Sequence, residues 1–347
     1  MVHFWNSLTE VPAGFGPSVV TLGNFDGVHR GHQQVLARLV ATARSRDEAA
    51  VAITFDPHPA QVHRPDSAPR QIMSLADRLD TMAASGVDAV LVMPYTLALA
   101  QQSPEEFVQS VFVDSLAAAA VVIGHDVRFG RGNSGDLATM ETLGARLGFD
   151  VMVIDEFGAD RRCSSTWVRE ALGRGDVATA AEVLGRPHHM RGEVVHGAGR
   201  GRELGFPTAN LSPAATGFIP ADGIYAGWLT DEAGSRWPAA VSVGSNPTFA
   251  HVGRQVEAYV IDRPQERVED FDLYGQNVVL EFVARLRGMV AYTGAEALVE
   301  QMCRDVDETR SILARDRSGE ADTPADTPAD TRSGWQNALS TEPRRAE

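Results

Sequence analysis

Residues 18–32 read Ser-Val-Val-Thr-Leu-Gly-Asn-Phe-Asp-Gly-Val-His-Arg-Gly-His, an apolar run followed by a turn that carries three glycines and two histidines. The apolar run predicts a buried strand, and the apolar spacing after Gly31 predicts a helix that ends near Ser45. Glycines let the backbone of such a turn approach a ligand closely, and the N–H groups at the start of a helix attract phosphate oxygens. The stretch therefore predicts an α/β domain with a phosphate-handling site after its first strand.

Four further apolar runs alternate with helical patterns through the first half of the chain. The predicted strands cover residues 50–55, 89–93, 120–123 and 150–154, and the predicted helices cover residues 75–85, 105–116 and 137–147. Strands that are apolar throughout and separated by helices are typical of a parallel sheet covered on both faces. We therefore predict a Rossmann-like parallel sheet for the first domain.

The pattern changes near residue 186, where short strands separated by Gly, Pro and Asp begin. The predicted strands cover residues 192–196, 223–230, 239–243, 255–261 and 277–285, and one helix covers residues 295–313. Several of these strands alternate in period two, as half-buried strands do, so we predict a small antiparallel barrel with a C-terminal helix. The tail carries an Ala-Asp-Thr-Pro repeat and little apolar material, which predicts disorder. We therefore predict a first domain over residues 1–186, a second domain over residues 187–316 and a disordered tail over residues 317–347.

Composition excludes several classes of function. The chain has 347 residues and a net charge of −15, which does not suit nucleic-acid binding or an anionic membrane surface. It contains no lysine, so a P-loop of the GxxxxGK[ST] type is excluded, and any phosphate site must use arginine, histidine, backbone N–H groups or a metal ion. Cys163 and Cys303 lie far apart, and the chain shows neither a signal peptide nor an apolar run long enough to span a membrane. We expect a cytoplasmic protein.

The two histidines of the glycine-rich turn are candidate catalytic residues. His29 and His32 are three residues apart, so they share one face at the start of the helix. Two imidazoles directed at one place can donate hydrogen bonds to the charge that develops on a leaving pyrophosphate. The alternative is that the pair caps the helix or binds a metal ion. Their position after a buried strand, within a glycine-rich turn, favours phosphate chemistry.

Polar clusters follow three other predicted strands, at residues 54–59, 124–130 and 162–169. The carboxyl ends of parallel strands meet at one edge of a sheet, which is where ligands bind. The last cluster combines Ser and Thr at a helix start with an arginine in the first turn, an arrangement that binds anions. An ordinary helix N-cap is the alternative for this cluster alone. The coincidence of four clusters at four strand ends favours a site.

Two features of the barrel predict kinase chemistry. Thr208 and Asn210 place a hydroxyl and an amide oxygen on the same side of an extended segment, and such hard oxygens suit Mg²⁺. A polar loop is the alternative. Glu281 interrupts an apolar strand, where period two separates it from the buried side chains, and it could accept the proton of an attacking hydroxyl. An exposed residue on the outer face of the strand explains Glu281 equally well.

The motifs resemble those of one known family. Gly-Asn-Phe-Asp-Gly-Val-His-Arg-Gly-His at 23–32, Thr-Phe-Asp-Pro-His-Pro at 54–59 and Ser-Ser-Thr-Trp-Val-Arg-Glu at 164–170 are similar to the adenylyltransferase module of bacterial bifunctional riboflavin kinase/FAD synthetases, in the wider HxGH nucleotidyltransferase superfamily. The segments 196–211 and 220–227 resemble the flavokinase module of the same enzymes, together with residues 244–249 and 272–275. The residues at 288–292 depart from the family version, which is acidic, contains lysine and ends in Phe.

The resemblance implies an enzyme that phosphorylates riboflavin to FMN and then adenylylates FMN to FAD, with ATP as co-substrate and Mg²⁺ in both steps. It implies catalytic roles for His29, His32 and Glu281, with Glu281 as the base of the kinase. The implied nucleotide-binding residues are Gly23, Phe25, Asp26, Gly27, His29, His32, Asp126, Arg162, Ser165, Thr166, Arg169, Gly201, Thr208 and Asn210. Thr208 and Asn210 would also bind the metal, and Arg287 and Tyr292 would bind the flavin.

Two alternative functions stay open at the level of sequence. One is a related HxGH transferase that acts on a pantetheine, nicotinate or glycerol phosphate, and the flavokinase-like barrel argues against it. The other is a non-catalytic flavin-binding protein, which the full set of motifs in both domains argues against. The sequence is compatible with a homo-oligomer and leaves the oligomeric state open.

Overall fold

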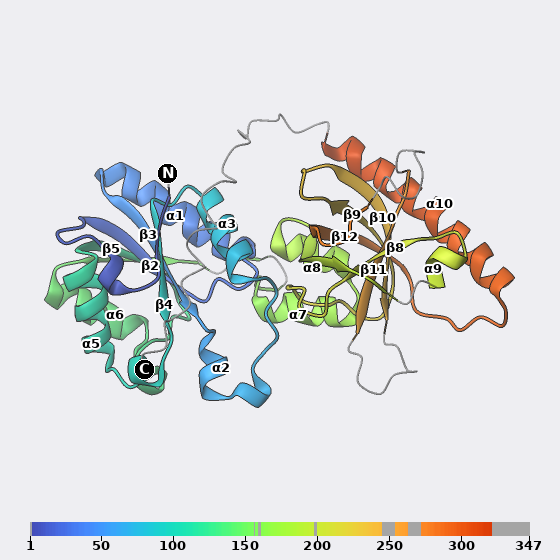
Figure 1. Ribbon diagram of the computed structural model, residues 1–347. Helices are drawn as coiled ribbons and strands as arrows, with labels where there is room; N and C mark the ends of the chain where they lie inside the picture. Colours follow the sequence, from blue (N-terminus) through green and yellow to red (C-terminus); the bar gives the residue numbers. More distant parts are fainter. Residues whose placement is uncertain are drawn as a thin grey trace, which may run out of the picture.

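A parallel sheet forms the first domain in the computed structural model, which describes residues 2–155, 157–158, 161–197, 200–244, 254–262 and 272–320 (Figure 1). The strand order is β1-β4-β3-β2-β5-β6, and every pairing is parallel. The strands are β1 (His3–Trp5), β2 (Ser18–Leu22), β3 (Ala49–Asp56), β4 (Ala89–Pro94), β5 (Ala118–Gly124) and β6 (Asp150–Ile154). The strand order reverses between β2 and β5, so ligands are expected at the carboxyl ends of these two strands.

Helices cover both faces of this sheet, and two apolar clusters fill the space between them. The helices are α1 (Arg30–Arg46), α2 (Pro59–His63), α3 (Leu75–Ala84), α4 (Leu97–Ala100), α5 (Pro104–Phe107) and α6 (Leu137–Leu147). A π-helical segment, η3 (Val108–Ser115), continues directly from α5, so the predicted helix at 105–116 is two elements. The predicted α/β class with a parallel sheet is confirmed.

The second domain is a closed antiparallel barrel with the strand order β10-β11-β8-β7-β12-β9. Its strands are β7 (His188–Val195), β8 (Thr208–Leu211), β9 (Gly223–Thr230), β10 (Arg236–Gly244), β11 (Gln255–Val260) and β12 (Asn277–Arg287), and a short helix, α9 (Arg200–Glu203), precedes β8. Alternate side chains fill the interior, as Val278, Leu280 and Phe282 show on β12. The predicted barrel is therefore confirmed.

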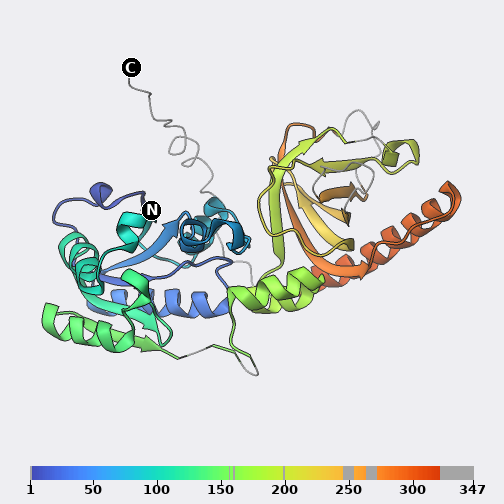
Figure 2. The same cartoon turned by 90° about the horizontal axis from the view of Figure 1, so that it is seen from below.

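The C-terminal helix α10 (Ala295–Glu320) lies along the outside of the barrel (Figure 2). Leu313 packs against Ala226 and Trp228 of β9, and the Trp228 indole N–H donates a hydrogen bond of 2.8 Å to Asp316. The helix extends past residue 317, where the tail was predicted to start. Residues 321–347, the rest of that tail, lie outside the described part of the chain. None of the described helices is long and apolar enough to cross a membrane.

Two helices, α7 (Ser165–Arg174) and α8 (Val177–Leu184), lie between the sheet and the barrel (Figure 2). Their buried residues belong to the same apolar cluster as the barrel interior, where Leu172 and Val183 join Tyr225 and Phe282. The N-terminal turn of α7, in contrast, carries part of the predicted nucleotide site. This helix therefore connects the core of one domain to the site of the other.

Polar contacts also join the domains. Asp77 of α3 is buried, and it lies 2.9 Å from the Arg191 guanidinium and 3.6 Å from the His189 ring of β7. Burial pushes the pKa of Asp77 up, but the nearby His189 ring, the hydrogen bond from Ser74 and the charge of Arg191 outweigh that effect and lower the pKa to about 2. The carboxylate therefore stays charged at the interface across the physiological pH range.

Candidate functional site

A cavity of about 820 Å³ opens at the carboxyl ends of β2 and β5, the place that the strand order predicts. We call it the N-domain cavity. The predicted site residues among its lining are Gly23, Phe25, His29, His32, Asp126 and Arg162. Part of the remaining wall is aromatic and consists of Phe55, Tyr95, Phe107 and Phe129. The cavity is thus lined both by the glycine-rich turn with its histidines and by aromatic side chains.

His29 and His32 lie against each other in this wall. Their ring centroids are 3.6 Å apart and their planes are inclined by 20°, and His29 is the N-cap of α1, where its Nδ1 accepts the backbone N–H of His32. Burial, followed by the charge of Arg162, lowers the pKa of His29 to about 4, and burial also lowers the pKa of His32 well below 6.5. Both imidazoles are therefore neutral at pH 7. Because Nδ1 of His29 is an acceptor, its ring proton is on Nε2, which is then a donor.

The turn that presents the histidines has an unusual backbone. Phe25, Gly27 and Val28 all have positive φ angles, of 50°, 83° and 39°. Positive φ is uncommon for any residue other than glycine and is strongly disfavoured for the β-branched Val28. A Cβ added to Gly31 would lie 3.2 Å from Nδ1 of His29, so glycine lets the ring pack against the start of α1. The surrounding structure must hold this conformation.

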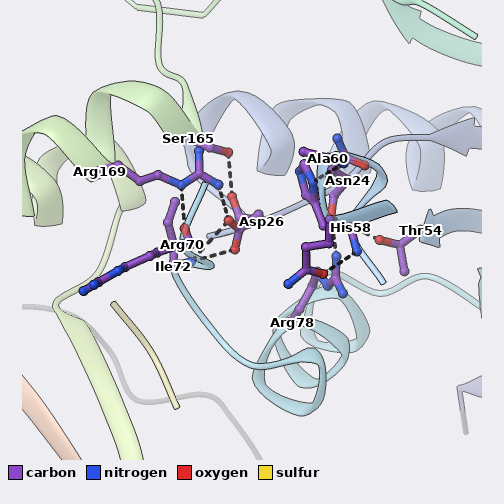
Figure 3. A network of polar contacts seen from close by, with 11 residues as sticks. Asn24, Asp26, Thr54, His58, Ala60, Arg70, Ile72, Arg78, Ser165 and Arg169 are labelled. Carbon is purple, nitrogen blue, oxygen red and sulfur yellow. Dashed lines mark hydrogen bonds and ion pairs between the residues drawn. The ribbon is translucent and has the colours of Figure 1, made fainter. Parts of the chain in front are cut away.

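Asp26 ties the turn to α7 rather than facing the cavity (Figure 3). Its carboxylate is buried, accepts the backbone N–H of Ile72 at 3.0 and 3.2 Å, and forms an ion pair with Arg169. Arg169 in turn donates to the Arg70 carbonyl at 2.7 Å, and the Ser165 hydroxyl donates to the Asp26 carbonyl at 2.8 Å. The structure thus brings Asp26, Ser165 and Arg169 together, and they bind one another as well as the backbone of Arg70 and Ile72.

The other predicted residues of this site divide into two groups. Arg162 and Asp126, from the loops after β6 and β5, both line the cavity and form an ion pair with each other. Thr166 is exposed on the first turn of α7. The remaining predicted residues do not line the cavity: Gly27, Thr166, Asp26, Ser165 and Arg169.

Arg78 of α3 is a buried residue of this region that no sequence pattern predicted. Its guanidinium donates to the Asn24 carbonyl at 2.7 Å, and the Thr54 hydroxyl donates to the same carbonyl at 3.1 Å (Figure 3). Burial lowers the pKa of Arg78. The charges of Asp26 and Asp56 act in the opposite direction but do not outweigh the effect of burial. A helical arginine usually faces solvent, so no sequence pattern marks this one.

The barrel has a second cluster of polar residues, on its outer surface where β8 pairs with β11. The Thr208 hydroxyl donates to Oε2 of Glu257 at 3.1 Å, and the Asn210 amide donates to the Thr208 carbonyl at 3.2 Å. Two glycines pack closely nearby, because a Cβ on Gly197 would lie 2.5 Å from the Asn210 side chain, and a Cβ on Gly201 would lie 2.4 Å from the Phe206 carbonyl. The structure thus brings Thr208, Asn210 and the loop before them together.

Glu281 is not part of this cluster. It lies on β12, which does not neighbour β8 in the barrel, and its carboxylate is 2.9 Å from the Arg236 guanidinium. It pairs with Trp228 on the barrel face that α10 covers. The structure therefore places Glu281 beside Arg236 and away from Thr208 and Asn210. The carboxylate beside Thr208 is that of Glu257.

Glu257 had a recognisable signal in the sequence. Val256 and Ala258 on either side of it are buried, so the period-two argument that singled out Glu281 applies equally to Glu257. Neither argument alone can say which outer face of a barrel carries the site. The pairing of Glu257 with Asn210 in adjacent strands places Glu257 on the same face as Thr208 and Asn210.

Arg287 and Tyr292, the predicted flavin-binding residues, lie together at the C-terminal end of β12. The Arg287 guanidinium is 5.8 Å from the centre of the Tyr292 ring and binds both oxygens of Asp305 in α10, at 2.6 and 2.9 Å. The hydrogen bond with Asp305 raises the pKa of Arg287. Within the described ranges, its contacts anchor α10 and do not extend to Thr208 or Asn210.

The oxygen cluster fits a magnesium ion by its chemistry. A hydroxyl, an amide oxygen and a carboxylate are the ligand types that Mg²⁺ prefers, and the ion usually completes its shell with water and substrate phosphates. Among the described residues there is no group of three or more His, Cys, Asp or Glu that could hold a metal ion. A metal site here would therefore depend on Thr208, Asn210 and Glu257 together with the nucleotide.

The fold and the two polar sites define a two-domain transferase that acts on nucleotides. Residues 13–167 match the FAD synthetase family and residues 184–313 match the riboflavin kinase family. The chain belongs to the family of bifunctional riboflavin kinase/FMN adenylyltransferases. It has both activities, and it converts riboflavin to FMN and FMN to FAD with ATP.

Individual relatives support this placement. The bifunctional riboflavin kinase/FMN adenylyltransferase of Escherichia coli K12 is 33% identical over 288 residues, which is 83% of this chain and 90% of the relative. The enzyme of the same name from Pseudomonas fluorescens is 35% identical over 85% of this chain and 93% of its own length. A solved structure described as a macrolide-efflux protein from Streptococcus pneumoniae aligns with a TM-score of 0.78 and 28% identity, over 89% of this chain and 98% of that one.

Proposed function

We propose that adenylyl transfer takes place in the N-domain cavity, with His29 and His32 at the phosphates of ATP. A phosphate oxygen of FMN attacks the α-phosphorus of ATP, the bond from that phosphorus to the bridging oxygen breaks, and pyrophosphate leaves. Neutral imidazoles donate hydrogen bonds to the charge that grows on the leaving group. The pair of stacked rings in the cavity wall, with their lowered pKa values, is the observation that carries this proposal.

The triphosphate is held from the α7 side. Ser165, Thr166 and Arg169 lie in the first turns of α7, where backbone N–H groups and a planar guanidinium bind phosphate oxygens. Arg162 approaches from the preceding loop and lines the cavity. In this role Arg162 and Arg169 exchange their carboxylate partners, Asp126 and Asp26, for phosphate. The aromatic part of the wall suits the flat ring of the flavin.

For the kinase step we propose that Glu257, in place of Glu281, is the base. It accepts the proton of the terminal ribityl hydroxyl of riboflavin while that oxygen attacks the γ-phosphorus of ATP, and ADP leaves. Thr208 and Asn210 hold the Mg-nucleotide, and Mg²⁺ neutralises charge on the phosphates when it is bound. Gly201 and the glycine-rich loop cover the phosphates with backbone N–H groups.

A direct assay tests both steps on the intact chain. The protein is incubated with riboflavin and Mg-ATP, and the flavins are separated by chromatography at successive times. FMN should appear first and FAD should follow, with pyrophosphate released in an amount equal to FAD. Tight flavin binding without turnover would contradict the catalytic proposal.

A further inference from the structure

The strained turn before His29 is held from behind by a residue that belongs to the junction between the domains. Arg186 lies in the short segment between α8 and β7, the first barrel strand. Its guanidinium donates to the Gly27 carbonyl at 2.7 Å and to the Val28 carbonyl at 3.2 Å. These two carbonyls belong to the residues with positive φ angles of 83° and 39°.

Gln33 of α1 completes this arrangement. Its side-chain amide donates to the Val28 carbonyl at 2.8 Å and to the Leu184 carbonyl, at the end of α8, at 2.7 Å. Arg186 also donates to the Leu184 carbonyl, at 3.2 Å. The turn and the C-terminus of α8 therefore share the same two donors. A guanidinium at the end of a helix is also favoured by the helix dipole.

The orientation of the peptide between Val28 and His29 follows from these bonds. A trans peptide is planar, so its N–H points opposite to its carbonyl. While Arg186 and Gln33 hold the Val28 carbonyl, the N–H of His29 faces the other way, at the start of α1. The same bonds fix where the His29 side chain leaves the backbone. Arg186 thus determines the geometry of a histidine whose ring it does not contact in the described structure.

We propose that Arg186 is a positioning residue for adenylyl transfer, which holds the Gly27–Val28 turn so that His29 and His32 meet the leaving pyrophosphate. The proposal rests on the function proposed above for the two histidines. Burial lowers the pKa of Arg186 to about 10, so its charge is retained at neutral pH. A shift of the histidines by about 1 Å is enough to lower the rate of the chemical step about 100-fold.

A capping role for Arg186 at α8 is the simpler explanation, and the chain offers a matched control for it. Arg285 donates to the Arg174 carbonyl at the end of α7, at 3.1 Å, and to the Asp222 carbonyl at 2.7 Å. It is an arginine at the same junction that caps the neighbouring helix, but it does not bind the turn. Arg285→Met should therefore leave adenylyl transfer unchanged.

The test measures kcat and KM for FAD formation from FMN and Mg-ATP in the full-length protein. Arg186→Met should lower kcat about 10- to 100-fold, with both KM values within about threefold of wild type. FMN formation from riboflavin, measured on the same preparation, should not change. Arg186→Lys, which keeps the charge but not the planar pair of donors, should recover part of the loss.

Four results would overturn the proposal: a wild-type kcat in Arg186→Met, an equal loss in Arg285→Met, a parallel fall in FMN formation, or a fully wild-type kcat in Arg186→Lys. The Lys variant decides the question if the Met variant does not fold. His29→Asn is measured alongside. If it retains adenylyl transfer, the proposed function fails. If it loses activity while Arg186→Met keeps it, only the role of Arg186 fails.

Discussion

The hydrogen bond between Thr208 and Glu257 leads to a quantitative prediction for the kinase step. In Glu257→Gln the side chain keeps its size, and its amide oxygen can still accept from Thr208, so the fold should be retained. The amide cannot accept a proton. General base catalysis contributes about 10²- to 10⁴-fold, which corresponds to about 2.7–5.4 kcal/mol of activation free energy. The kcat of FMN formation should fall within that range.

Glu281→Gln is the matched control. The ion pair of Glu281 with Arg236 joins side chains that are 25% and 32% exposed, and such a pair contributes about 0–1 kcal/mol to stability. The variant should lower the melting temperature by a few degrees at most and leave kcat for FMN formation within about twofold of wild type.

Both variants are assayed by chromatographic separation of FMN formed from riboflavin and Mg-ATP. FAD formation from added FMN serves as the internal control, because it takes place in the other domain. A wild-type rate of FMN formation in Glu257→Gln would refute the reasoning. Loss of that rate in Glu281→Gln alone would restore Glu281 as the base.

Three further predictions concern the first domain and its junction with the barrel. Replacing both His29 and His32 with Ala should abolish FAD formation and spare FMN formation, as measured with each flavin substrate separately. The pKa of Asp77, about 2, lies below its ordinary value of 3.8, so this group stabilises the fold above about pH 4 and the contribution, on the order of 2 kcal/mol, is lost as the pH falls towards 2. Asp77→Asn should therefore flatten the acid limb of a stability–pH curve from denaturant unfolding, and an unchanged limb would contradict the interface role. Leu172→Ala should lower the free energy of unfolding by about 2–5 kcal/mol, because this leucine is fully buried in the cluster that α7 shares with the barrel, and calorimetry that shows destabilisation of neither domain would refute that packing.

The periodicity of the sequence was sufficient for most of the fold. Buried parallel strands are apolar throughout and helices repeat every 3.6 residues, so the alternation in the first half indicates its sheet. Short elements were missed, as β1 and β8 show, with three and four residues. A run that short has too few positions for a period to appear.

The sequence by itself also determined the chemistry available to the protein. The absence of lysine excluded a P-loop, and the turn at residues 23–32 predicted a phosphate site at the start of α1. These conclusions depend on residue types and local spacing, which folding does not change. The resemblance of motifs in both halves then implied the two activities that the family shows.

Only the tertiary structure decided which side chains meet. Period two assigns Glu257 and Glu281 equally to the outside of a strand, and closure of the barrel places Glu257 beside Thr208 and Glu281 beside Arg236. The bonds of Arg186 to the turn join residues about 160 positions apart in the sequence. No local pattern encodes such pairs, because their distance depends on how helices and strands far apart in the chain pack together.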